Sequence, residues 1–506
     1  MSVSSGLNRA GILTGLVAVV LVAAALVVRP DGSSDSATAP ASDTLTAIRS
    51  ATPSAALDVV STTRLGAPVE VSRRLLESSP TVVLADATDP AAQQIAITSA
   101  STLGVPVLLD TPEAPAEIDR LGATTVLTFG RVAAVPGATA VPVDEAQAAA
   151  EIDRRREAAG QRSAATADAI VMTRSASSNA AAVATARAAG AHVLEVPDAD
   201  PRTDSEAARY LAEHPDHPVI ALGSSFAHVA YPLDVVRKGI EQPAGGYLAL
   251  GGKTTYTAMY GHPGAPQLGV LGEQGVQASI KRVERLVRKY QRAAPDAEFV
   301  PTFEIIATVA SASAGKDKNY STETPVAELL PLVDAAEKAG IYVILDLQPG
   351  RTDFLTQAKK YRSLLERPHV GLAIDPEWRL TKKQKHLVQI GSVTADEINR
   401  TGDWLADLTK SKSLPQKIFV LHQFSSSMIK HRGRLDTSRP ELATVIHVDG
   451  SGPQGAKQGT WHHLRAKAPR GVGWGWKNFV DEDSPMLTAQ QTWRQVKPHP
   501  DLITYQ

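Results

Sequence analysis

Two carboxylates directly follow an apolar run in the segment "VGLAIDPEW", residues 370–378. On a continuing β-strand, Asp375 and Glu377 would point to the same face with Cα atoms about 6.6 Å apart. Two neighbouring acids raise one of their pKa values, which gives a proton donor beside an ionised partner. Trp378 could stack on a sugar ring. The spacing therefore predicts Asp375 and Glu377 as a catalytic acid/base or acid/nucleophile pair.

The same residues also have a structural interpretation. Pro376 would end the strand, Asp375 would cap the segment that follows, and Glu377 would pair with Arg379. In that case the two acids would stabilise the fold without taking part in chemistry.

The elements that must position these acids are strands and helices in alternation from residue 268 onward. Four amphipathic helical segments are predicted at 278–294, 326–340, 352–366 and 395–410. The eight strand-like runs are 268–273, 303–311, 341–348, 370–377, 417–424, 443–450, 471–479 and 502–506. This count predicts a (β/α)8 TIM-like barrel, with an open sheet as the alternative. The segment 243–267 would serve as a lead-in or a lid.

Active sites of such barrels lie at the carboxyl ends of the strands. Nearly every predicted strand ends there in a polar or aromatic residue. Acids at these ends would position a substrate, and the aromatic residues would stack on it. Besides Ser311, which shares this position, the predicted substrate-binding residues are Glu273, Asp346, Gln348, Trp378, His422, Gln423, Asp449, Trp476, Lys477, Asn478 and Tyr505.

Other chemistries lack support in the sequence. The chain has no cysteine, which excludes disulfides and thiolate chemistry. Asp375, His422 and Asp449 could bind a divalent metal, but no H-x-x-x-H or H-x-D spacing accompanies them, so neither a metal nor a cofactor is predicted. Glycine-rich nucleotide motifs and the G-x-S-x-G elbow are also missing. A net charge of -1 argues against nucleic-acid binding.

The first 44 residues predict the compartment. Ala10–Val28 is apolar and uncharged, lies between Arg9 and Arg29, and is just long enough to cross a bilayer. We expect residues 1–28 to be a signal anchor or signal peptide that contacts the membrane. Residues 29–44 are rich in Ser, Pro, Asp and Ala and predict a flexible linker. The folded part is therefore expected outside the cytoplasm, either anchored or secreted.

Residues 45–240 show a repeated pattern of short apolar strands and helices. Strand-like runs at 81–86, 105–110 and 124–130 recur at 169–174, 192–198 and 218–223. In both copies a glycine, Gly104 or Gly190, ends the first helix, where a left-handed conformation is common. Continuous apolar strands between helices predict a parallel sheet covered on both faces, so we expect a doubly wound α/β region.

Two resemblances extend these predictions. Residues 72–130, with their "TVVLAD" and "PVLLD" strands, resemble the cell wall-binding type 2 repeat of Gram-positive surface proteins, and residues 165–223 resemble it weakly. That family usually has three copies where this chain has two, and the resemblance implies attachment to anionic wall polymer. The D-x-E strand end is similar to that of lysozymes of the Chalaropsis type and, more loosely, of chitinase-like barrels. The largest glycosidase clan differs, because it has a carboxylate where Lys477 and Asn478 stand.

The barrel as a whole, residues 241–506, resembles uncharacterised C-terminal domains of actinobacterial surface proteins. The combined expectation is an exported, cell-envelope-associated glycoside hydrolase whose partner is cell-wall polysaccharide. The alternative is a surface protein that binds wall or glycan without cleaving it.

Overall fold

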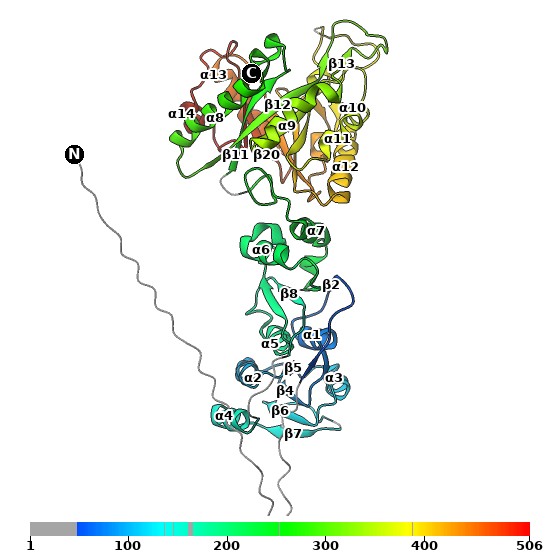
Figure 1. Ribbon diagram of the computed structural model, residues 1–506, viewed down its shortest axis with the longest axis vertical. Helices are drawn as coiled ribbons and strands as arrows, with labels where there is room; N and C mark the ends of the chain where they lie inside the picture. Colours follow the sequence, from blue (N-terminus) through cyan, green and yellow to red (C-terminus); the bar gives the residue numbers. More distant parts are fainter. Residues whose placement is uncertain (1–47, 136, 145, 160–164, 252–253, 387) are drawn as a thin grey trace, which may run out of the picture. The chain divides into compact units, whose positions relative to one another are not determined.

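The computed structural model describes residues 48–506 apart from 136, 145, 160–164, 252–253 and 387 (Figure 1). The predicted membrane segment and linker lie outside the described residues. Within the part of the chain that is described, no helix is long and apolar enough to cross a membrane. The fold is mixed α/β, and its largest sheet is a closed barrel of parallel strands.

The barrel has eight parallel strands, which confirms the predicted TIM-like architecture and makes the open-sheet alternative wrong. The strands, in ring order, are β11 (Thr254–Gly261), β12 (Glu298–Ala310), β14 (Tyr342–Leu347), β15 (Val370–Ile374), β17 (Lys417–His422), β19 (Leu442–Val448), β20 (Gly473–Asn478) and β21 (Leu502–Tyr505). The ring closes because β11 pairs with both β12 and β21. A short strand β13 (Ser321–Glu323) pairs antiparallel with the end of β12.

Helices cover the outside of the ring (Figure 1). They are α8 (Val276–Ala293), α9 (Val326–Lys338), α10 (Phe354–Lys360), α11 (Arg362–Leu365), α12 (Ala395–Ser411), α13 (Gln454–Arg465) and α14 (Ala489–Gln495). One apolar cluster, which includes Phe303, Leu345 and Trp476, contains residues of these helices and of the strands. A second, separate cluster, which includes Tyr256, Ile344 and Val420, contains strand residues of the opposite parity and fills the barrel interior.

The first strand differs from the prediction. Residues 268–273 form no strand; they belong to the 3-10 turns η3 (Pro266–Leu268) and η4 (Val270–Glu273). The true first strand, β11, lies in the segment expected to be a lead-in or lid. A search for apolar runs misses β11 because the strand is rich in Thr and Tyr, although nearly all of its residues are buried. The turns fold back closely on β11, since a Cβ on Gly261 (φ 147°) would lie 2.9 Å from the carbonyl oxygen of Gly269.

Two four-stranded parallel sheets occupy the segment before the barrel. The first contains β4 (Thr81–Ala85), β5 (Val107–Leu109), β6 (Thr125–Phe129) and β7 (Thr139–Pro142), in the order β5-β4-β6-β7. The second contains β2 (Leu57–Val60), β8 (Ile170–Thr173), β9 (His192–Glu195) and β10 (Val219–Leu222), in the order β2-β10-β8-β9. In both sheets the second strand of the strand–helix–strand unit lies on one side of the first, and the third strand lies on the other.

The helices of this segment begin and end at recognisable residues. They are α1 (Ala67–Leu75), α2 (Pro90–Leu103), α3 (Ala114–Arg120), α4 (Ala148–Ala159), α5 (Ala180–Ala188), α6 (Ser205–Glu213) and α7 (Ala230–Lys238). Asp89 caps α2 by accepting hydrogen bonds from two backbone N–H groups, and Gly104 ends it in the left-handed conformation, as predicted.

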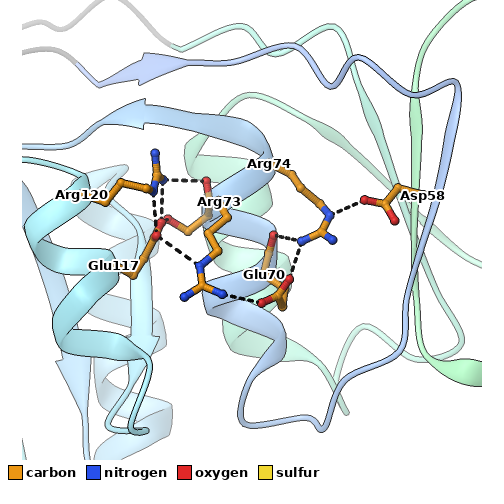
Figure 2. A network of polar contacts seen from close by, with 7 residues as sticks. Asp58, Glu70, Arg73, Arg74, Glu117 and Arg120 are labelled. Atoms are coloured by element: carbon orange, nitrogen blue, oxygen red, sulfur yellow. Dashed lines mark hydrogen bonds and ion pairs between the residues drawn. The ribbon is translucent and has the colours of Figure 1, made fainter.

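An ion-pair network joins β2, α1 and α3 (Figure 2). The carboxylate of Glu117 on α3 is fully buried and accepts two hydrogen bonds from Arg120, at 2.8 and 2.7 Å, and one from Ser72. On α1, Arg74 donates to Asp58 of β2 at 2.5 Å and to Glu70 at 2.6 Å. These pairs neutralise charges between neighbouring elements and are structural.

Candidate active site

Strand alternation gathers polar side chains in the barrel interior near the carboxyl ends of the strands. Residues two apart point to the same side of a strand, so the inward positions of each strand change from apolar to polar towards its carboxyl end. On β14 the inward series is Tyr342, Ile344 and Asp346, and all three are buried. The interior polar group comprises Tyr260, Glu304, Asp346, Asp375, His422, Asp449 and Lys477.

His422 lies at the centre of this group and bridges two carboxylates. Its Nε2 lies 2.9 Å from Glu304 Oε1, and its Nδ1 lies 2.9 Å from Asp449 Oδ2. Despite burial, the neighbouring carboxylates raise the pKa of His422 well above its ordinary value. Burial alone would favour neutral acids, but His422 holds the pKa values of Glu304 and Asp449 below their ordinary values. The bridge is therefore an imidazolium between two anions.

Asp346 and Tyr260 form a second pair beside the bridge. The Tyr260 hydroxyl donates to Asp346 Oδ2 at 2.8 Å, and Gln348 Nε2 donates to the Tyr260 oxygen at 3.3 Å. The Lys477 ammonium lies 3.6 Å from the centre of the Tyr260 ring. Burial raises the pKa of Asp346 above its ordinary value against the attraction of His422. Asp346 is thus the more readily protonated neighbour of the bridge.

Asp375 and Glu377 occupy different environments although they are two residues apart. β15 ends at Ile374, and Asp375 caps the 3-10 turn η5 (Pro376–Trp378) by accepting a hydrogen bond from the Glu377 N–H at 3.1 Å. The expected continuous strand through Glu377 is wrong, because Pro376 starts this turn. Capping by Asp375, the structural interpretation, is confirmed, but Arg379 pairs with Glu397 at 2.8 Å and not with Glu377.

The two acids also differ in protonation. Burial, together with the charges of Asp346, Asp449 and Glu377, raises the pKa of Asp375 well above its ordinary value. Burial and the charge of Asp449 raise the pKa of Glu377 to about 7, although Lys477 and His422 oppose this shift. Burial therefore favours the protonated form of Asp375, whereas Glu377 titrates near physiological pH.

A cavity of about 530 Å³ opens above the polar group. Six of the predicted site residues line it, namely Gln348, Asp375, Glu377, Trp378, Asp449 and Lys477. Tyr260, Phe424 and Phe479 are among its other walls. Within the described residues, Asp449 Oδ1 is buried and lacks a hydrogen-bond partner.

Several predicted site residues do not reach the cavity. Trp476, Asn478 and Tyr505 were expected to contact a sugar, but they occupy the outward positions of β20 and β21 and are buried against helices. The Trp476 indole donates to Asn478, and the Tyr505 hydroxyl bonds to Tyr290 at 2.8 Å. Only alternate residues of a strand face inward. On β20 the inward positions are taken by Gly475 and Lys477, so the residues beside them face outward.

Three other predicted positions are also structural. Glu273 lies in the turn η4, is exposed and pairs with Arg282, so its assignment as a strand-end acid is wrong. Gln423 is buried and bonds to Arg432 and to the carbonyl of Ser425. Ser311 bonds to Ser313. His422 and Asp346 do not line the cavity directly; they lie beneath Asp449 and Tyr260.

Sequence reasoning missed Glu304, Tyr260 and His447. Glu304 interrupts the apolar run "TFEIIATV" at an inward position, and a charge in such a run was the available signal. Tyr260 was missed because β11 was assigned to a lead-in segment. His447 is buried, bonds to Thr504 at 2.8 Å, and burial lowers its pKa to about 3, so it is neutral.

A metal could occupy this site only after rearrangement. Asp375, His422 and Asp449 offer three ligand atoms within 4.8 Å of one another. Both nitrogens of His422 are engaged by carboxylates, so coordination would require His422 to release Asp449 or Glu304. The geometry supports a hydrogen-bonded ion cluster better than a set of metal ligands.

Comparisons of the chain with protein-family models, curated proteins and solved structures found no match. The fold and the site place the protein in the class of closed (β/α)8 barrels. Its site is a cluster of carboxylates around a protonated histidine, beneath a cavity. The resemblances to the wall-binding repeat and to the lysozyme strand end rest on the quoted residues alone.

Proposed function

We propose that the barrel is a glycoside hydrolase that acts on cell-envelope polysaccharide. The observation that carries this proposal is a pair of cavity-lining acids whose pKa values are shifted in opposite directions. Glu377 has a pKa of about 7, whereas His422 keeps Asp449 ionised. Glycoside hydrolysis requires one acid that donates a proton and one carboxylate that stays charged.

Each site residue has a role in this mechanism. Protonated Glu377 donates to the glycosidic oxygen as the bond breaks. The Asp449 carboxylate, which His422 keeps ionised, stabilises the positive charge that develops on the sugar ring before water adds to the anomeric carbon. Asp375 holds the turn that carries Glu377, and burial favours its protonated form, which does not repel the neighbouring carboxylates. The Trp378 ring supplies an apolar wall on which a sugar face stacks. Asp375 is thus a positioning residue in this proposal, and Asp449 takes its place in the catalytic pair.

The segment before the barrel would hold the enzyme at its substrate. We propose that residues 45–240 form a doubly wound α/β repeat that attaches to anionic wall polymer, and that residues 1–28 deliver the chain across the membrane and outside the cytoplasm. The repeated sequence pattern supports the first part, as does the shared strand order of the two four-stranded sheets.

The test compares wild type, Glu377→Gln and Asp449→Asn on isolated cell wall, with new reducing ends as the readout. Each substitution should lower the rate about 10²–10⁴-fold, because an amide can neither donate the proton nor hold the charge. Glu328→Gln, which changes an exposed acid on the outer helix α9, is the matched control and should leave the rate unchanged. Wall binding by wild type without any release of reducing ends would support the non-catalytic alternative.

A further inference from the structure

Six cations gather on one side of the barrel mouth. They lie on the loops that follow β12, β14 and β15, three strands that are neighbours in the ring. All but Arg351 are exposed, and Arg351 is half-buried. We call them the basic sector: Lys316, Lys318, Arg351, Lys382, Lys383 and Lys385.

The acids of the same loops do not neutralise the basic sector. Glu323 pairs with Lys360 at 2.7 Å, Asp353 caps α10, and Glu397 pairs with Arg379. Among the described residues, the members of the basic sector form no ion pair with a carboxylate. Apart from Asp375 and Glu377, which line the cavity, Asp317 is the remaining acid of these loops, and it is exposed. The sector therefore carries a net positive charge.

The opposite side of the mouth is acidic. The loop after β20 carries the exposed residues Asp481 and Glu482, while Asp483 is neutralised by Lys457 at 2.6 Å. In the ring, β20 lies four strands from β14 in either direction. Charge is thus separated across the mouth, which produces a field that orients a charged ligand.

Side-chain contacts connect the basic sector to the cavity. Trp378, which lines the cavity, has its ring centre 5.5 Å from that of His386, and His386 Nε2 bonds to the Tyr320 carbonyl at 2.7 Å. The Arg351 guanidinium lies 4.3 Å from the Tyr320 ring centre and donates to the Gln384 carbonyl at 2.8 Å. The three loops therefore brace one another, and the sector begins where the Trp378 wall ends.

We propose that the glycan taken by this barrel is anionic, and that the basic sector binds carboxylate or phosphate groups on sugar units that extend out of the cavity past Trp378. Lys477 brings a further cation into the cavity itself. The inference rests on the proposed function for the cleavage step, but binding can be measured without it.

An anionic membrane surface is the main competing occupant. Val388 and Ile390, 75% and 49% exposed, lie on the same loop as three of the lysines. We favour the glycan because the basic sector continues inward to an aromatic wall and to a polar cavity with the dimensions of a sugar site. Insertion into a bilayer would use only the outer part of one loop.

The experiment measures binding by full-length protein in the Glu377→Gln background, so that no polymer is consumed. Tryptophan fluorescence is the readout, because all six tryptophans lie in the barrel and polymer bound by residues 45–240 does not contribute to the signal. The polymers are polygalacturonate, poly(glycerol phosphate) and neutral dextran, which separate carboxylate, phosphate and uncharged chemistry. The test variant is Lys382→Gln/Lys383→Gln/Lys385→Gln. The control is Lys281→Gln/Arg285→Gln/Lys289→Gln, which removes the same charge from the exposed face of α8.

We expect wild-type binding to at least one anionic polymer and weaker binding to dextran. The test variant should raise the dissociation constant for the anionic polymer about tenfold or more and reduce its salt dependence, whereas the control should not. Equal loss in both variants, or stronger binding to dextran, would overturn the proposal. So would a test variant that loses binding to phosphatidylglycerol vesicles but keeps glycan binding.

Failure of this inference and failure of the proposed function give different results. Cleavage of a neutral glycan without anionic binding would remove the inference and leave the hydrolase assignment. Sector-dependent binding of an anionic polymer that is never cleaved by wild type would keep the inference and remove the hydrolase assignment.

Discussion

Direct contact with His422 determines which of the buried interior acids are ionised. Glu304 and Asp449 touch its ring nitrogens at 2.9 Å and are ionised, although both are buried. Asp375 is buried to a similar degree without such a contact, and burial raises its pKa. Burial removes the water that stabilises a carboxylate, so a buried acid stays ionised only when a cation contacts it directly.

The rate of glycan cleavage should show a bell-shaped pH dependence. The rate should fall as the pH rises through about 7, because Glu377 then loses the proton that it must donate. It should also fall at low pH, where Asp449 becomes protonated below its ordinary pKa range. The measurement is kcat/KM against pH.

The variant His422→Gln isolates the acidic limb of this profile. Removing the cation raises the pKa of Asp449, so the acidic limb should move to higher pH. An acidic limb that stays in place in a variant with native circular dichroism would contradict the role of the bridge.

A second prediction at the scale of the residue concerns Lys417, the first residue of β17. It is fully buried, donates to the carbonyls of Arg367 and Val370 at 2.6 and 2.8 Å, and burial lowers its pKa to about 7. Between pH 7 and 10 the unfolded chain holds the proton that the folded chain lacks, so stability rises with pH.

Relative to Lys417→Met, the free energy of unfolding of wild type should increase by roughly 3–5 kcal/mol from pH 7 to 10. Urea unfolding at three pH values measures this. The exposed Lys410→Met is the control and should show no such trend. Parallel pH dependences for wild type and Lys417→Met would show that Lys417 is charged in the folded state.

At the scale of the element, loop bracing positions Glu377. Gly350 follows β14 and bonds to the β15 loop through Leu380 N–H at 2.7 Å. It has φ 60°, and a Cβ there would lie 2.1 Å from the Asn319 carbonyl oxygen on the β12 loop. The mouth loops therefore meet at a point where no side chain fits.

Gly350→Ala should destabilise the protein by at least about 2 kcal/mol more than Gly340→Ala. Gly340 has the similar φ of 65°, but nothing lies within 4 Å of its added Cβ, so it isolates the cost of the backbone conformation. Urea unfolding of both variants measures the difference. Equal costs would mean that the loops separate without loss of stability.

At the scale of the whole molecule, the proposed function requires delivery and attachment before catalysis. Deleting residues 1–44 should give soluble, folded protein, because the only long apolar run lies there. Gel filtration and far-UV circular dichroism test this. Aggregation with loss of helical signal would show that the run belongs to the folded core.

Residues 45–240 should sediment with purified cell wall more strongly than residues 241–506. The reason is the proposed wall-binding repeat, which lies wholly in the first piece. The readout is the fraction of each purified piece that pellets, and wall stripped of its anionic polymer is the control. Equal pelleting of both pieces, or pelleting of neither, would remove the assigned role of the N-terminal region.

Sequence alone determined the barrel class and the chemistry available to it. Apolar runs alternating with amphipathic helices identified seven of the eight strands, because both patterns are local, whereas β11 was missed. Polar residues at the strand ends mark the carboxyl face. The missing cysteines exclude thiolate chemistry without any structure. Asp375, Glu377 and Asp449 were found in this way, and all three line the cavity.

Only the tertiary structure decided which strand-end residues share a site. Trp476 and Tyr505 carry suitable chemistry but face outward, since a shift of one residue reverses the side of the strand. Glu304 lies 118 positions from His422 in the chain and touches it only because the barrel closes. Protonation likewise depends on this closure: burial and neighbours across the ring, which no local pattern records, make Glu377 an acid and keep Asp449 an anion.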